Sequence, residues 1–154
     1  MDLMMTSQNL EQLTKTGKIK TEPRDRKEFE GLIRSAKVRL TDAQTAPLSL
    51  ESRVDLAYNA AHALALAALR WNGYRSESRY LVFQCIPHTL GLGPEVWRVL
   101  AICHDRRNRA EYEGDLDIDE QLVKGLLQAT ATLLERVVEL GQREDFEKRA
   151  PRRT

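Results

Sequence analysis

An alanine-rich stretch near the middle of the chain constrains the fold more than any other part of the sequence. Residues 50–72 combine strong helix formers with small side chains on nearly every side of the expected helix. The alanines of this stretch are Ala57, Ala60, Ala61, Ala63, Ala65, Ala67 and Ala68. Because small side chains let neighbouring helices approach from several directions, we expect this helix at the centre of a bundle. Ser49 is a natural N-cap for it, and Gly73 a natural stop.

Helical periodicity also covers most of the remaining chain. We predict helices over residues 24–43, 93–112 and 117–141, with shorter ones over residues 9–16 and 76–90. Asp117 is expected to cap the last helix and Gly141 to end it. No segment shows the alternation of apolar and polar residues that is typical of a strand. The sequence therefore predicts an all-α fold, an antiparallel up-and-down bundle of four to five main helices.

The chain of 154 residues is long enough for one domain with a sizeable core. We expect three parts in it. Residues 1–23 form an N-terminal arm with a short helix, residues 24–141 form the helical bundle, and residues 142–154 form a charged C-terminal tail.

Composition narrows the class of protein further. Hydrophobic residues make up 42% and charged residues 31% of the chain, which is typical of a soluble globular domain. A formal net charge of +1 means that any phosphate binding must come from a local patch. The cysteines, Cys85 and Cys103, form neither a disulfide framework nor a metal-binding spacing. No signal peptide or membrane span is visible, so we expect a cytoplasmic protein without a metal or a cofactor.

The candidate site lies at the end of the helix predicted over residues 93–112. Residues three and four apart share one face of a helix, so the apolar stripe of residues 96–101 continues into a polar one. The polar stripe comprises His104, Arg107, Asn108 and Glu111. A half-buried arginine needs a partner, because an unpaired buried charge is costly. Arginine also offers a planar fork of donors that suits phosphate. We therefore expect Arg107, Asn108, Arg106 and Glu111 to bind a nucleotide or RNA.

The run from Arg107 to Tyr112 resembles the signature of the HEPN superfamily (higher eukaryotes and prokaryotes nucleotide-binding domain). In that signature an arginine and a polar residue, often asparagine, precede a histidine after a short spacer. Arg107 and Asn108 match, whereas Tyr112 stands in place of the histidine. The segments 58–61 and 72–75 and the acidic loop before the last helix also resemble this family. The resemblance covers roughly residues 29–140.

The resemblance implies a function and a set of partners. HEPN proteins form homodimers in which the motif helices face each other. They act in bacterial defence or toxin–antitoxin systems, often beside a small nucleotidyltransferase. In nuclease-competent members, the ribose 2′-hydroxyl attacks the adjacent phosphate without a metal. The arginine then stabilises the charged phosphorane and the histidine moves protons. This chain is thus expected to bind a nucleotide or RNA and to have weak or lost ribonuclease activity.

Two interpretations of the site remain open. In the first, Arg107 and Tyr112 are catalytic, and His104, one helical turn before Arg107, supplies the missing imidazole. Tyrosine is a poor base near neutral pH because its unperturbed pKa is about 10. In the second, the bundle is a non-catalytic homodimeric module that docks a partner such as a nucleotidyltransferase, and the motif serves only structure.

Overall fold

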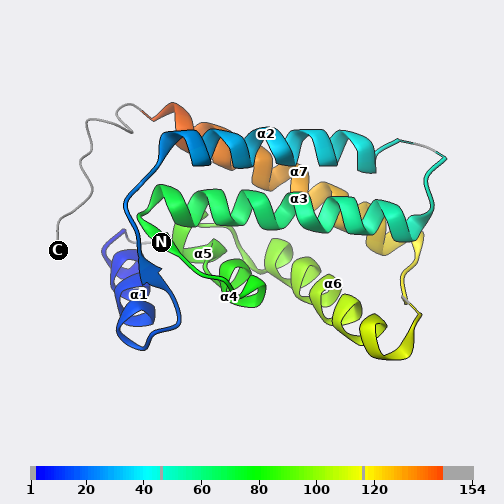
Figure 1. Cartoon of the computed structure of the whole chain (residues 1–154), viewed down its shortest axis with the longest axis horizontal. Coiled ribbons are helices and arrows are strands. Elements are labelled where there is room, and N and C mark those ends of the chain that lie inside the picture. Colours follow the sequence, from blue (N-terminus) through cyan, green and yellow to red (C-terminus); the bar gives the residue numbers. More distant parts are fainter. Residues whose placement is uncertain (1–2, 46, 116, 144–154) are drawn as a thin grey trace.

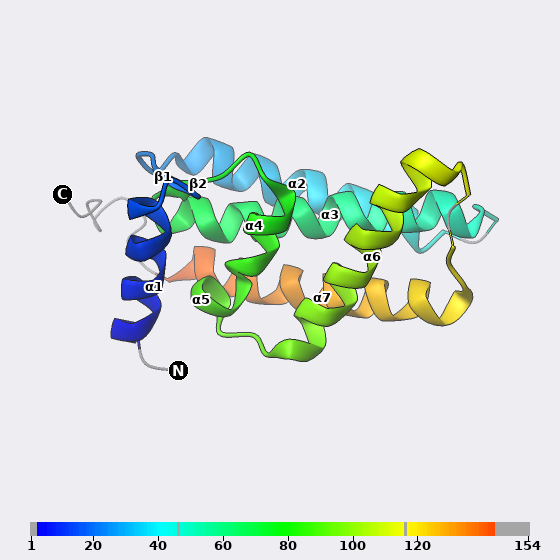
Figure 2. The same cartoon turned by 90° about the horizontal axis from the view of Figure 1, so that it is seen from below.

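Helix α3 (Leu50–Trp71) lies at the centre of a helical bundle (Figure 1). The computed structural model describes residues 3–45, 47–115 and 117–143, with side chains from residue 9 onward. The other long helices are α2 (Arg26–Ala43), α6 (Pro94–Glu113) and α7 (Glu120–Gln142). Successive long helices alternate in direction, and α6 lies obliquely across the face of α3 and α7 (Figure 2). The predicted all-α bundle is confirmed.

The alanines of α3 explain its central place. Ala57, Ala60 and Ala61 are completely buried, and the helix contacts α2, α7, α6 and the shorter elements. Since each methyl group projects only a short distance, neighbouring helices reach α3 from several sides at once. The Ser49 side chain accepts a hydrogen bond from the Ser52 amide at 3.1 Å, which confirms the predicted N-cap.

Three short helices complete the described fold. Helix α1 (Leu3–Lys15) begins earlier than predicted and packs against α5 (Ile86–Leu90). Leu10 of α1 is buried. Helix α4 (Arg79–Gln84) is capped by Ser78 and is separated from α5 at Cys85. Pro87 lies in the first turn of α5, where its missing amide hydrogen costs nothing.

Two expectations about helix ends were wrong. The cap of α7 is Asp119, not Asp117, because the Asp119 side chain accepts a hydrogen bond from the Leu122 amide at 2.8 Å. Gly141 does not end α7, which continues through Gln142. It serves a different purpose, since a side chain there would collide with a buried aromatic ring of α2.

A small antiparallel sheet contradicts the expectation that no strand occurs. Strand β1 (Lys20–Thr21) pairs with β2 (Tyr74–Arg75), with Lys20 opposite Arg75. Each strand has two residues, which is too short to produce an alternating pattern in the sequence. The sheet joins the N-terminal arm to the end of α3.

Next to this sheet, Arg70 is 2% exposed, and every nitrogen of its guanidinium donates a hydrogen bond. Nε donates to Glu28 at 2.7 Å, and the terminal nitrogens donate to the backbone carbonyls of Glu22, Pro23 and Tyr74. Arg75 binds the carboxylates of Glu22 and Glu28 from the solvent side. We call these four charged residues, Glu22, Glu28, Arg70 and Arg75, the arginine clasp. Burial would raise the pKa of Glu28, but the hydrogen bonds from both arginines outweigh it and lower that pKa below its usual value.

Gly141 allows α7 to lie close to α2. A methyl group added at Gly141 would lie 2.8 Å from Cε2 of Phe29, a residue that is buried against Trp71. We expect Gly141→Ala to lower the free energy of unfolding by about 1–3 kcal/mol, the usual cost of overpacking a core. Urea unfolding followed by circular dichroism measures this change.

The matched control for Gly141 is Gly125, in the same helix. A methyl group at Gly125 would lie 3.9 Å from the nearest Val99 atoms, an ordinary contact distance. Gly125→Ala should therefore raise stability by about 0.4–1 kcal/mol through the lower entropy of the unfolded chain. Equal effects of the two substitutions would contradict the close approach at Gly141.

Candidate functional site

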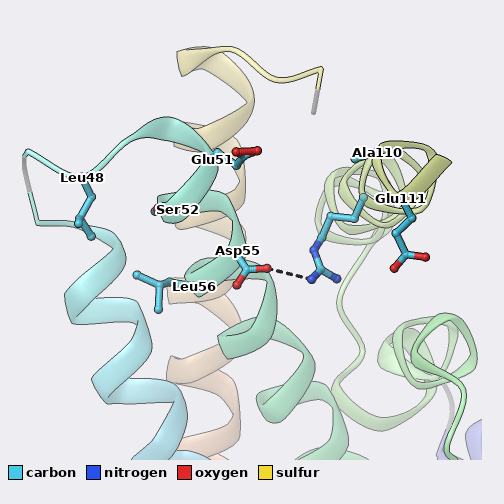
Figure 3. Close-up of a pocket in the computed structure, with 8 residues that line it drawn as sticks. Leu48, Glu51, Ser52, Asp55, Leu56, Ala110 and Glu111 are labelled. Carbon is cyan, nitrogen blue, oxygen red and sulfur yellow. Dashed lines mark hydrogen bonds and ion pairs between the residues drawn. The ribbon is translucent and has the colours of Figure 1, made fainter. Parts of the chain in front are cut away.

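The candidate site lies where α6 meets α3 beside the short helix α4. On α6, His104, Arg107 and Asn108 share the face that the sequence predicted for them. Arg107 reaches across to α3, where its Nη2 lies 2.8 Å from Oδ1 of Asp55 (Figure 3, dashed line). The arginine that the motif singles out therefore does have an ionic partner, and that partner is on the central helix.

Tyr58 is the centre of the site. Its side chain is 1% exposed, and the guanidinium carbon of Arg107 lies 4.3 Å from the centre of its ring. The guanidinium of Arg79, from α4, lies 5.6 Å from the same ring. Such cation–π contacts hold arginines at an aromatic face without neutralising their charge. Two cationic groups are thus fixed around one buried tyrosine.

Both nitrogens of the His104 ring are hydrogen-bonded. Nδ1 lies 2.8 Å from the hydroxyl oxygen of Tyr58, and Nε2 lies 3.1 Å from the amide nitrogen of Asn108. Burial lowers the pKa of His104, and the nearby charge of Arg107 lowers it further, so the ring is neutral at pH 7. Burial raises the pKa of Tyr58 despite the opposing charges of Arg107 and Arg79, so its hydroxyl stays protonated. The site therefore presents a neutral imidazole in a fixed orientation.

Beside His104, α4 contributes two further side chains. Nη1 of Arg79 donates to Oδ1 of Asn59 at 2.8 Å. The Tyr80 ring is 43% exposed, and its centre lies 5.5 Å from the centres of both the His104 and the Trp97 rings. The site thus has an aromatic border as well as a cationic one.

An open groove adjoins the site between the start of α3 and the end of α6 (Figure 3). Its volume is about 710 Å³. The lining consists of Leu48, Glu51, Ser52, Asp55, Leu56, Arg107, Ala110 and Glu111. Three carboxylates and one guanidinium line this groove together with apolar side chains, so the groove has a net negative charge. The groove therefore differs in character from the cationic surroundings of Tyr58.

The structure brings together only part of the predicted site. Arg107, Asn108 and His104 share one network, and Glu111 lines the groove beside Arg107. Arg106 instead donates to the backbone carbonyl of Asp117, in the loop before α7, at 2.9 Å. Tyr112 is 87% exposed and lies outside the network of hydrogen bonds and ring contacts described above.

Sequence reasoning placed none of Asp55, Tyr58, Asn59, Arg79 and Tyr80 in the site. The segment 58–61 contributed only to the family resemblance. A signal was present, because Asp55, Tyr58 and Asn59 form a polar stripe on an otherwise alanine-rich helix. Arg79 and Tyr80 come from a six-residue helix too short to show a pattern of its own.

No protein-family model matches this sequence, and searches of the curated proteins and of the solved structures gave no match. Among the described helices, none combines the length and apolar character needed to cross a membrane. Within the same residues, no cluster of three or more histidine, cysteine, aspartate or glutamate side chains could hold a metal ion.

Proposed function

We propose that the chain is a cytoplasmic, HEPN-like protein that binds a nucleotide or RNA. In this proposal it belongs to a toxin–antitoxin or defence system, and its metal-independent ribonuclease activity is weak or lost. The observation that carries the proposal is the placement of Arg107 and Arg79 around Tyr58, next to His104 and Asn108. Guanidinium groups held in a fixed orientation suit the oxygens of a phosphate.

The same geometry supports weak rather than efficient cleavage. Proton transfer requires a group whose free nitrogen or oxygen reaches the ribose 2′-hydroxyl. The lowered pKa of His104 keeps its ring neutral, as a base must be, but both of its nitrogens are already hydrogen-bonded. Tyr58 stays protonated, and Tyr112 projects into solvent away from the network. Arg107 would stabilise the charged phosphorane. His104 would serve as the base only after its ring gave up one of these two hydrogen bonds.

Incubation of the purified protein with a panel of single-stranded RNAs in EDTA tests this proposal. Wild type is expected to bind RNA and to cleave it slowly at most, whereas Arg107→Ala should bind RNA much more weakly and should not cleave it. His104→Ala should remove residual cleavage while retaining part of the binding, because the cationic groups remain. Tyr112→Phe shows whether that hydroxyl contributes. Purifying all variants in parallel reveals a contaminating nuclease, because it would cut RNA in every sample. If the wild-type protein binds no RNA, the proposal is wrong.

A second candidate function rests on the acidic groove between α3 and α6. Three carboxylates beside Leu48, Leu56 and Ala110 suit a partner with a basic and apolar surface better than they suit RNA. In this alternative, two copies pair with their α6 helices facing, and the dimer docks a protein such as a nucleotidyltransferase. Substitution of Glu51 by glutamine should then weaken partner binding and leave RNA binding unchanged. Sedimentation of the protein alone reports the dimer.

A further inference from the structure

Tyr80 combines exposure with rigid support. Other large apolar or aromatic side chains are also exposed on the molecule. Tyr80 is 43% exposed, and its ring contacts two further aromatic rings, those of Trp97 and His104. It meets Trp97 edge to face, with an interplanar angle of 61°, and His104 at 41°. Contact with both rings restricts the rotation of the tyrosine side chain. A ring that is both accessible and fixed loses little entropy when another flat group stacks on it.

Four aromatic rings form a row of successive contacts, from Trp97 of α6 to Tyr80 of α4, then to His104 of α6 and Tyr58 of α3. The centres are 5.5 Å apart from Trp97 to Tyr80, 5.5 Å from Tyr80 to His104, and 6.3 Å from His104 to Tyr58. The guanidinium of Arg107 lies over the last ring, and Arg79 adjoins Tyr80 in the chain. The exposed ring of Tyr80 is therefore linked through His104 to the buried Tyr58 ring that both arginines border.

An acidic group lies close to one of these cations and limits which ligand fits. Asp55 pairs with one terminal nitrogen of Arg107. A ligand bound only by charge would have to compete with that carboxylate. A ligand that adds stacking to one or two phosphate contacts has an independent source of affinity.

We propose that Tyr80 stacks on an unpaired nucleobase of single-stranded RNA while Arg79 and Arg107 hold the neighbouring phosphates. This inference rests on the proposed function and deepens it, because it assigns the substrate class. Bases within a duplex are already stacked on each other and present no free face. The site therefore selects single strands, and Tyr80 is the residue that makes the selection.

The chain contains a reporter for this contact. Trp97 touches the Tyr80 ring, whereas the other tryptophan, Trp71, is 2% exposed and packs against Phe29. Titration with a single-stranded RNA of about twelve nucleotides, a length within the usual reach of one binding surface, should quench the emission of Trp97. The same RNA annealed to its complement should bind at least about tenfold more weakly, since the loss of one base–aromatic stack lowers the affinity by about that factor.

Two substitutions of Tyr80 separate stacking from simple exposure. Tyr80→Leu keeps an apolar side chain but removes the ring, and should weaken single-strand binding by about tenfold or more. Tyr80→Phe keeps the ring and should bind within about twofold of wild type, since stacking needs no hydroxyl. Ile102→Ala is the matched control, because Ile102 is 42% exposed on α6 and lies outside the row of rings. Its affinity for RNA should equal that of wild type.

The outcomes are distinguishable. If single-stranded RNA binds wild type and Tyr80→Leu equally, or if the duplex binds as tightly as the single strand, the stacking role is wrong and the proposed RNA binding stands. If neither RNA binds wild type, both proposals fail. Thermal unfolding of Tyr80→Leu verifies that the variant is folded. The comparison of single-stranded with duplex RNA uses wild type alone, so a folding defect of the variant does not affect it.

Discussion

Replacing Arg70 with methionine is expected to lower the free energy of unfolding by about 3–5 kcal/mol, the usual cost of removing one partner of a buried ion pair. The side chain is buried, and its loss would leave the Glu28 carboxylate with only one of its two arginine donors. It would also remove the hydrogen bonds to the backbone carbonyls of Glu22, Pro23 and Tyr74. Unsatisfied groups in a buried position lose their interaction with water without any replacement. Urea unfolding of both proteins measures the difference.

Arg75→Met is the matched control for this experiment. Arg75 binds the same two carboxylates, Glu22 and Glu28, but its side chain is 25% exposed. Water can replace its hydrogen bonds, so we expect a loss of no more than about 1 kcal/mol. Equal losses for the two variants would mean that the arginine clasp acts through surface charge, and not through the burial of Arg70.

The second large effect is expected on RNA binding. Under the proposed function, Arg107→Ala should weaken the binding of single-stranded RNA by about 10- to 100-fold, since hydrogen bonds to a charged group contribute about 1.5–3 kcal/mol. Asp55→Asn should act in the opposite direction. It keeps the shape of the side chain but removes the negative charge that lies 2.8 Å from the guanidinium. Because the pair is partly exposed, the expected gain in affinity is no more than about fivefold.

Arg109→Ala provides the control for charge alone. Arg109 lies two residues from Arg107 on α6, but its side chain is 53% exposed and pairs with Asp105 on the same helix. Its removal changes the net charge by the same amount and should change the affinity by less than about twofold, as expected for a solvated surface charge. Fluorescence anisotropy with labelled RNA at fixed salt measures all four proteins. A loss of affinity by Arg109→Ala as large as that by Arg107→Ala would contradict a specific phosphate site.

The fold could be predicted where local chemistry decides it. Small alanine side chains on nearly every side placed α3 at the centre of the bundle, and Ser49 marked a helix start that the structure confirms. The prediction was wrong where two residues compete for one local role. Asp117 and Asp119 both precede the last helix, and only the backbone geometry of the loop selects Asp119 as the cap.

The candidate site was predictable on α6 and not beyond it. His104, Arg107 and Asn108 share a face because of helical spacing, which the sequence contains. Their partners do not follow from spacing, because Asp55 is 52 residues from Arg107 and Tyr58 is 46 residues from His104. The same limit applies to Gly141, whose requirement for a missing side chain comes from Phe29 in another helix.

The small sheet and the arginine clasp have a consequence for the order in which the chain folds. Helices α2 and α3 are neighbours in sequence and pack along their lengths, so their contacts close a short loop. The arm meets these partners across long loops, as with Glu22 and Arg75, which are 53 positions apart in the sequence. Closing a long loop costs more chain entropy than closing a short one. The arm is therefore expected to dock on the bundle only after the α2–α3 pair has formed.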